Sequence, residues 1–177
     1  GVAPGKYGPT RPVTRAQVAV FLHASACTKA PVGTSIAAGD SSSCVLNDDQ
    51  TVACWGLNAE GQLGDGTTTN RLAPTQVPGL TSTISLTAGR SHSCALKAHG
   101  TVACWGSNDS GQLGDGTTTN RLEPTLVLGL SGVLAIDAGD SHTCAVKRDA
   151  KVACWGFNYY GQLGDGTTTN RLTPTPV

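Results

Sequence analysis

The sequence predicts an all-β protein made of three four-stranded propeller-type blades, preceded by one short α-helix. Cys-Trp-Gly begins at Cys54, Cys104 and Cys154, so the chain repeats itself every 50 residues. Periods of about 40 to 50 residues are typical of propeller blades and of paired-helix solenoids. Each unit is rich in Gly, Thr and Val and has no helical period, which favours blades in a partial or open β-propeller. The expected repeats are 34–83, 84–133 and 134–177.

Each repeat is expected to contribute four short strands, as the middle repeat illustrates. A tight turn at 98–100 joins two of them into a hairpin, and the stretch 107–120, rich in Gly, Asn, Asp and Thr, is a predicted loop. The last strand contains proline, which is tolerated at a sheet edge. The predicted strands of this repeat are 83–88, 93–97, 101–105 and 124–128.

Residues 1–33 differ in kind from the repeats. Thr14 is a predicted N-cap with Gln17 three positions later, which is a capping box, so a helix is expected near 15–26. The chain contains no methionine and starts with glycine, which is typical of a processed product or of a piece of a longer protein.

Charge and hydropathy exclude several partners. The 12 Lys and Arg residues balance 12 Asp and Glu residues, and only 14% of the chain is charged. We therefore expect no binding of nucleic acid or of an anionic membrane surface. The longest unbroken apolar stretch runs from Val18 to Leu22, well below the roughly 18 residues that a membrane helix needs, so no membrane span is expected.

Six of the seven cysteines form pairs ten residues apart. Directly opposed residues of an antiparallel hairpin have a constant index sum, and the register that opposes Cys44 and Cys54 leaves 48–50 as the turn. Opposed Cα atoms lie about 4.5 to 5.5 Å apart, a distance that a disulfide can span. One cross-strand disulfide is thus expected in each blade. The expected pairs are Cys44–Cys54, Cys94–Cys104 and Cys144–Cys154.

A zinc site is the competing interpretation of these cysteines. It would use Cys94, Cys104 and His92, but structural zinc usually needs closer cysteine spacing, and the first repeat carries Ser42 in place of the histidine. We favour disulfides, with no metal and no cofactor, and disulfides imply an extracellular or cell-surface location. Cys27 is the unpaired thiol. Three roles stay open for it: a buried free thiol, a bridge between chains, or the partner of an upstream cysteine.

No catalytic residues are expected, so we predict that the protein is not an enzyme. The only neighbours common to His92 and His142 are serines, and hydrogen bonding to the adjacent blade is favoured over general-base catalysis. The loop 65–70 is dense in oxygen ligands, but Asp65 is its only acidic residue, so backbone capping is favoured over calcium binding. Arg71 and its equivalents are expected to pair with this aspartate or with the next blade, as an inter-repeat contact.

Three further features point to packing or recognition. One tryptophan per repeat, Trp55 and its equivalents, is expected to pack between blades. At loop positions where the copies differ, the last repeat carries Phe157, Tyr159 and Tyr160, an exposed aromatic cluster suited to protein binding. Asn108 begins an Asn-Asp-Ser sequon and is a candidate glycosylation site on an exposed loop.

Ordered motifs relate the repeats to a known family. His-Ser-Cys-Ala-Leu at 92–96, the segment ending in Cys-Trp-Gly at 100–106, Asn108, and Gly-Gln-Leu-Gly at 111–114 together resemble the regulator of chromosome condensation repeat. The resemblance covers 34–177 and implies one blade per repeat of a propeller that usually closes with six or seven blades. Three blades are fewer than such a ring needs. No loop of this chain matches those that nucleotide exchange on a small nuclear GTPase depends on.

The segment ahead of the repeats has a resemblance of its own. Residues 7–22 look like the tail of an S-layer homology motif. Together the two resemblances imply bacterial surface architecture of the secreted type.

These observations predict a non-catalytic structural or interaction module of an extracellular or cell-surface protein. Open blade faces at both ends favour assembly with copies of itself, either as a closed ring of two chains or as a head-to-tail filament. The alternative is a secreted propeller module that binds another protein, for example as an enzyme inhibitor or an adhesin.

Overall fold

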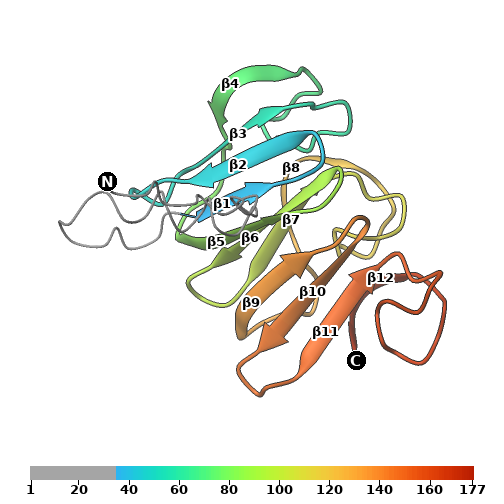
Figure 1. Ribbon diagram of the computed structural model, residues 1–177. Coiled ribbons are helices and arrows are strands. Elements are labelled where there is room, and N and C mark those ends of the chain that lie inside the picture. Colours follow the sequence, from blue (N-terminus) through green and yellow to red (C-terminus); the bar gives the residue numbers. More distant parts are fainter. Residues whose placement is uncertain (1–34) are drawn as a thin grey trace, which may run out of the picture. The chain divides into compact units, whose positions relative to one another are not determined.

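The computed structural model describes residues 35–177, which form three four-stranded antiparallel sheets, one per repeat (Figure 1). Blade 1 contains β1 (Ser35–Ala38), β2 (Ser42–Leu46), β3 (Val52–Gly56) and β4 (Arg71–Gln76). Blade 2 contains β5 (Thr83–Ala88), β6 (His92–Lys97), β7 (Val102–Gly106) and β8 (Arg121–Leu126). Blade 3 contains β9 (Val133–Ala138), β10 (His142–Lys147), β11 (Val152–Gly156) and β12 (Arg171–Pro176).

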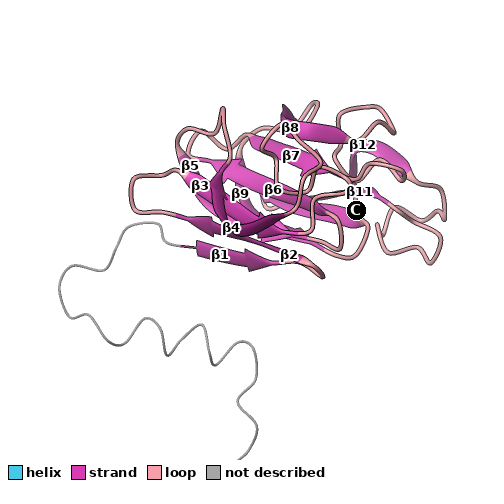
Figure 2. Cartoon of the chain, turned by 90° about the horizontal axis from the view of Figure 1, so that it is seen from above, coloured by secondary structure: helices cyan, strands magenta, loops and turns pink. Residues whose placement is uncertain are grey.

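The predicted fold class is confirmed for this part of the chain. All regular structure in 35–177 is strand, and long loops join the third and fourth strands of each blade (Figure 2). None of the described residues forms a helix that is long and apolar enough to cross a membrane. The helix expected near 15–26 and the thiol of Cys27 lie outside the described residues.

The blades follow one another in chain order, and their first strands β1, β5 and β9 are neighbours (Figure 1). The apolar core lies between blades rather than within one. A first cluster, which includes Leu46, Leu63 and Trp105, joins blades 1 and 2. A second cluster, which includes Leu113 and Trp155, joins blades 2 and 3. Each blade is therefore stabilised mainly by its neighbours, as in repeat proteins generally.

Burial along the third strands reflects the number of neighbours. In β7, at the centre of the stack, every residue is buried, whereas β3 of blade 1 leaves Trp55 partly exposed. A side chain of the middle blade is covered by the blade before it or the blade after it. Within 35–177 no blade precedes blade 1, so no described blade covers that face of it.

The hairpins form in the predicted register, but the outer strand does not. Cys44 opposes Cys54 and the turn falls at 48–50, as the index sum requires. The outer strand β8 starts at Arg121, three residues ahead of the predicted strand 124–128. A register shift between Cys104 and Gly106 lets Arg121 pair with that glycine, so the strand begins where the loop ends.

Candidate functional site

One disulfide joins the second and third strands of each blade. The paired Cα atoms are 4.1 Å apart in each case. The sulfur atoms that a zinc site would need are thus bonded to each other, which argues against the zinc alternative. Within 35–177 no three side chains of the metal-ligating types are grouped to hold a metal ion. The disulfides are Cys44–Cys54, Cys94–Cys104 and Cys144–Cys154.

The long loop of each blade is organised by a buried asparagine. In blade 2 the Asn108 side-chain amide donates to the Asp115 carboxylate at 3.1 Å and to the carbonyls of Thr117 and Thr119 at 3.0 and 3.1 Å. The Asn108 side-chain oxygen accepts the amide N–H of Leu113 at 3.0 Å. Asn58 and Asn158 make the same set of bonds in the other blades.

Asn108 does not have the exposed position that the sequon led us to expect. The residue is 0% exposed, and its amide nitrogen already donates within the loop. A glycan on that nitrogen would need an exposed side chain and would displace these hydrogen bonds. The sequon falls on the residue that holds the loop together.

An aspartate and an arginine complete the loop from within the same repeat. Asp115 receives the Arg121 guanidinium at 2.7 Å and the backbone N–H and hydroxyl of Thr117 at 3.0 and 2.7 Å. Burial raises the pKa of Asp115, but the hydrogen bonds from Thr117 and Arg121 outweigh it and hold that pKa below its usual range. Of the two partners expected for this arginine, the loop aspartate is confirmed, and the pair lies within one repeat rather than between repeats. The carboxylate oxygens are occupied by the loop's own donors, as the capping interpretation requires.

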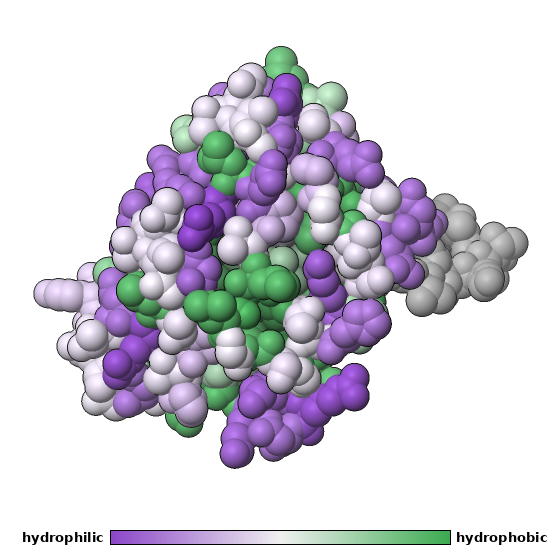
Figure 3. Space-filling model, turned by 180° about the vertical axis from the view of Figure 1, so that it is seen from behind, coloured by the Kyte–Doolittle hydropathy of each residue, from purple (hydrophilic) through white to green (hydrophobic). Residues whose placement is uncertain are grey.

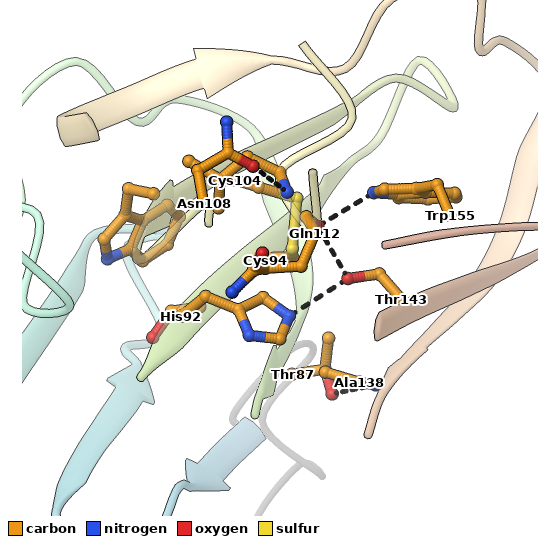
Figure 4. The surroundings of a disulfide bond; sticks show 12 residues. Thr87, His92, Cys94, Cys104, Asn108, Gln112, Ala138, Thr143 and Trp155 are labelled. Atoms are coloured by element: carbon orange, nitrogen blue, oxygen red, sulfur yellow. Dashed lines mark hydrogen bonds between the residues drawn. A yellow bond between two sulfur atoms is a disulfide. The ribbon is translucent and has the colours of Figure 1, made fainter. Parts of the chain in front are cut away.

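The indole of each covered tryptophan crosses from one blade to the next. Trp105 Nε1 donates to the main-chain carbonyl of Gln62 at 3.0 Å, and Trp155 Nε1 donates to that of Gln112 at 2.9 Å (Figure 4). Both indoles are fully buried. A Cβ atom on Gly114 would lie 2.7 Å from the Trp155 Nε1, so a glycine is required where the loop meets the ring. The expected packing of tryptophan between blades is borne out for these two residues.

A histidine adds a second crossing between blades 2 and 3. His92 Nε2 lies 3.0 Å from Thr143 Oγ1, which donates in turn to the Gln112 carbonyl at 3.0 Å (Figure 4). Because the carbonyl can only accept, the hydroxyl proton goes to it and His92 Nε2 is the donor to Thr143. His92 Nδ1 is buried without a partner, and a proton there would be unsatisfied. Burial, followed by repulsion from His142, lowers the pKa of His92 to about 4.

The long loops of blades 1 and 2 also contact the outer strand of the next blade. Gly66 N donates to the Leu122 carbonyl at 3.0 Å, and Gly116 N donates to the Leu172 carbonyl at 2.9 Å. Between blades 1 and 2, Asn120 Nδ2 donates to Glu60 Oε2 at 2.6 Å. At the first joint the Ser93 hydroxyl donates to the Gln62 carbonyl at 3.2 Å, as the Thr143 hydroxyl does to the Gln112 carbonyl at the second. The joint between adjacent blades therefore consists of the indole, this hydroxyl, and the loop-to-strand contact.

One half of this joint is left uncovered on blade 1. Leu72, the equivalent of Leu122 and Leu172, is 101% exposed, against 37% and 36% for those two. Trp55 and Ser43 are partly exposed. Trp55 is the equivalent of Trp105 and Trp155, and Ser43 is the equivalent of Ser93 and Thr143. We call this surface, made of Ser43, Trp55 and Leu72, the leading face.

The complementary half is left uncovered on blade 3. Gln162 and Gly164 are more exposed than the buried Gln112 and Gly114, and no tryptophan of 35–177 donates to the Gln162 carbonyl. Tyr159 is 68% and Tyr160 81% exposed. We call this surface, residues 157–166, the trailing face. On it the Tyr159 and Tyr160 rings meet edge to face with centroids 5.0 Å apart, and Phe157 lies 6.2 Å from Tyr160.

Large apolar side chains are also exposed away from the loops. Ile36, Ile84 and Leu134, from the first strands of the three blades, are 61%, 46% and 56% exposed. Figure 3 shows hydrophobic side chains gathered in the middle of the face seen from behind. Apolar surface of this kind is typical of interaction sites.

Several residues of the joints were not identified from the sequence. The roles of Asn108, the Gln112 carbonyl, Thr143 and Leu72 became apparent only from the contacts. The letter-for-letter identity of 61–72, 111–122 and 161–172 was the available indication, since a loop that meets the next blade in the same way must keep the same residues.

Family models and solved structures agree with this geometry. The model described as the regulator of chromosome condensation (RCC1) repeat matches residues 51–96, 99–146 and 149–177. A second model of the same repeat matches 34–62, 84–112 and 133–162. No curated protein sequence matches the chain significantly.

Three solved structures are similar in fold. Yeast RCC1 (Prp20) in complex with Kap60 is 23% identical with a TM-score of 0.73, over 80% of this chain and 36% of that chain. Prp20p from Saccharomyces cerevisiae, studied for its binding to Gsp1p and histones, is 25% identical with a TM-score of 0.70, over 80% and 37%. Human WBSCR16 is 24% identical with a TM-score of 0.71, over 81% and 39%. The chain thus spans little more than a third of each of these proteins.

Proposed function

The chain belongs to the regulator of chromosome condensation (RCC1) repeat family, whose propeller fold is a protein-interaction module, and from that premise we propose a specific role for it. It is a non-catalytic structural module of an extracellular or cell-surface protein, and it assembles with copies of itself. The trailing face of one copy binds the leading face of another.

One observation carries this proposal: the same joint is formed twice inside the chain, and its two halves are exposed at the two ends. The trailing face offers the Gln162 carbonyl and the Gly166 amide, which correspond to the Gln112 and Gly116 groups that bind blade 3. The leading face offers an indole at Trp55. A second copy would therefore supply each half with the partner that the internal joints already use.

Burial of Leu72 would contribute to association. Leu72 is fully exposed in the single chain, whereas its equivalents at the two internal joints are 37% and 36% exposed. Full burial of a leucine side chain contributes about 1.5 to 3 kcal/mol, so partial burial of Leu72 adds less than that to the contacts of the indole and the loop. The contact is heterologous, because two different surfaces meet. Such contacts close into a ring when the rotation per copy allows it and otherwise continue as a filament.

Separate observations support the proposed location and the proposed lack of catalysis. Three disulfides support an oxidising compartment outside the cytoplasm. The resemblance of residues 7–22 to an S-layer homology motif supports attachment to a bacterial surface. His92 and Asp115, the kinds of residue that an enzyme would use, are engaged with Thr143 and Arg121 in the fold.

The test is the molecular size of the purified chain over a range of concentrations, measured by sedimentation velocity and electron microscopy. We expect species larger than the 17.9 kDa monomer that dissociate on dilution. Leu72→Asp should weaken association by roughly 10-fold or more, since it removes the burial of a leucine and adds a charge. Leu126→Asp is the matched control, because Leu126 is also exposed but lies on the outer strand of the middle blade. A folded monomer at every concentration would overturn the proposal.

A further inference from the structure

We propose that Tyr159 and Tyr160 select the partner of the trailing face by covering Leu72 of a second copy. This inference rests on the proposed function and assigns its specificity to two residues. The identical loop segment 161–172 is kept at the joint between copies, and the side chains at 159 and 160 are among those that differ from the two internal joints.

The internal joints fix where these positions lie. Glu60 of blade 1 accepts a hydrogen bond from Asn120 of blade 2 at 2.6 Å. A Cβ atom on the adjacent Gly61 would lie 2.5 Å from Leu122 Cδ2, and a Cβ atom on Gly111 would lie 2.5 Å from Leu172 Cδ2. The residue before each of these glycines therefore lies at the outer strand of the next blade.

Because the chain repeats every 50 residues, the equivalent positions can be identified on the trailing face. Tyr160 occupies the position of Glu60, and Gly161 that of Gly61. A blade docked on blade 3 in the same way brings Asn70 and Leu72 to these residues, because they are the equivalents of Asn120 and Leu122. Tyr160 would thus lie beside the leucine of the leading face, and Tyr159 packs edge to face on Tyr160 with centroids 5.0 Å apart.

The chemistry of the two surfaces is complementary. The internal loops carry Ala59 and Glu60, or Asp109 and Ser110, at these positions. Leu122 and Leu172, which lie against the glycine that follows each of these pairs, keep more than a third of their area exposed. The trailing face presents two rings held edge to face, with Phe157 against both of them at 6.2 and 6.4 Å. Rigid aromatic side chains lose little entropy on binding and are the usual energetic centres of interfaces.

A second copy is the occupant that the joint itself favours. The segment 161–172 is identical to 61–72 and 111–122, so the backbone that receives an incoming blade is the same at all three loops. The incoming surface must then carry an indole and a leucine at the corresponding positions. The leading face carries both.

The test replaces Tyr159 and Tyr160 with the residues that blade 2 has at the same positions, giving Tyr159→Asp with Tyr160→Ser. The fold should be kept, because the loop of blade 2 forms with these residues. We expect the dissociation constant between copies to rise at least tenfold. The double variant Tyr159→Phe with Tyr160→Phe keeps the rings and should assemble like the parent chain.

Mixing two one-sided variants tests the pairing directly. The Tyr159→Asp/Tyr160→Ser chain keeps an intact leading face, and the Leu72→Asp chain keeps an intact trailing face. Each alone should be monomeric at concentrations where the parent assembles, and the mixture should form a dimer of one copy of each. A mixture that stays monomeric would overturn the inference.

The outcomes separate this inference from the proposed function. If Leu72→Asp abolishes assembly while Tyr159→Asp/Tyr160→Ser assembles with the parent's dissociation constant, the tyrosines do not select the partner and the self-assembling role stands. If the parent chain is monomeric at every concentration, both proposals fail. Loss of binding to a different protein in the tyrosine variant, with assembly intact, would assign the aromatic cluster to that other partner and also overturn the inference.

Discussion

Protonation of His92 should destabilise the protein in a defined pH range. The imidazole is buried, its Nε2 donates to Thr143, and its Nδ1 has no acceptor for a second proton. The pKa of His92 is lowered to about 4 from the ordinary value of 6.5. Since the unfolded chain binds this proton more readily, stability is fully present above pH 6.5 and is lost as the pH falls toward 4.

The size of the effect follows from the two pKa values. Each unit of pKa difference corresponds to about 1.4 kcal/mol, so His92 alone removes about 3 kcal/mol between pH 6.5 and 4. The pKa values of Asp65, Asp115 and Asp165 are also lowered, by hydrogen bonds that outweigh burial in the first two and that dominate in the third. In the unfolded chain these carboxylates take up protons near their ordinary pKa of 3.8, whereas in the folded protein they do so only at lower pH, so their effect on stability begins where that of His92 ends.

Urea unfolding at intervals from pH 7.5 to 4, followed by tryptophan fluorescence, measures this effect. The Leu72→Asp background should keep association from contributing to the apparent stability. His92→Ser is the matched variant, because the first repeat carries Ser42 at the same position. Its free energy of unfolding should change by much less than that of the parent over this range. Equal slopes in the two proteins would refute the assignment of the pH dependence to His92.

Two further predictions concern the scaffold. Asn108→Ala should lower the free energy of unfolding by about 2 to 4 kcal/mol in thermal or urea denaturation, since it leaves several buried loop groups without a partner. Ser110→Ala, which destroys only the sequon, should leave stability unchanged and lower the mass of the protein only by that of the hydroxyl oxygen. Replacing Cys94 and Cys104 together by serine should cost about 3 kcal/mol, measured by urea unfolding under non-reducing conditions. An unchanged midpoint in either Asn108→Ala or the cysteine variant would show that the contact concerned does not stabilise the fold.

Local patterns were sufficient for the architecture of one repeat. Alternation of side chains, the turn at 48–50 and the ten-residue cysteine spacing fix which residues of a hairpin oppose each other, because antiparallel pairing is a relation between near neighbours in the chain. The start of the outer strand was missed. Its first pair, Gly106 with Arg121, depends on a register shift that no period-two pattern contains.

Charge and motif patterns were less reliable within the long loop. Asn108 has the sequence of a glycosylation site, and Arg121 was expected to pair either with the aspartate of its loop or with the next blade. In the structure the first is enclosed and the second binds Asp115 of its own repeat. The sequence could not decide either placement, because a polar side chain of a compact loop is satisfied by whichever donors and acceptors the loop's path brings near it.

The sequence by itself determined that this protein is a stack of three nearly identical units, each with its own cross-strand disulfide, because repetition and hairpin register are written in residue spacing. Only the tertiary structure decided which groups join one unit to the next. The Trp155–Gln112 and His92–Thr143 contacts link residues 43 and 51 positions apart. Whether such residues meet depends on how one blade stacks on another. For the same reason, the exposure of Leu72 and of the two tyrosines, on which the proposed assembly depends, follows from their place in blades 1 and 3 of the described stack and not from their identity.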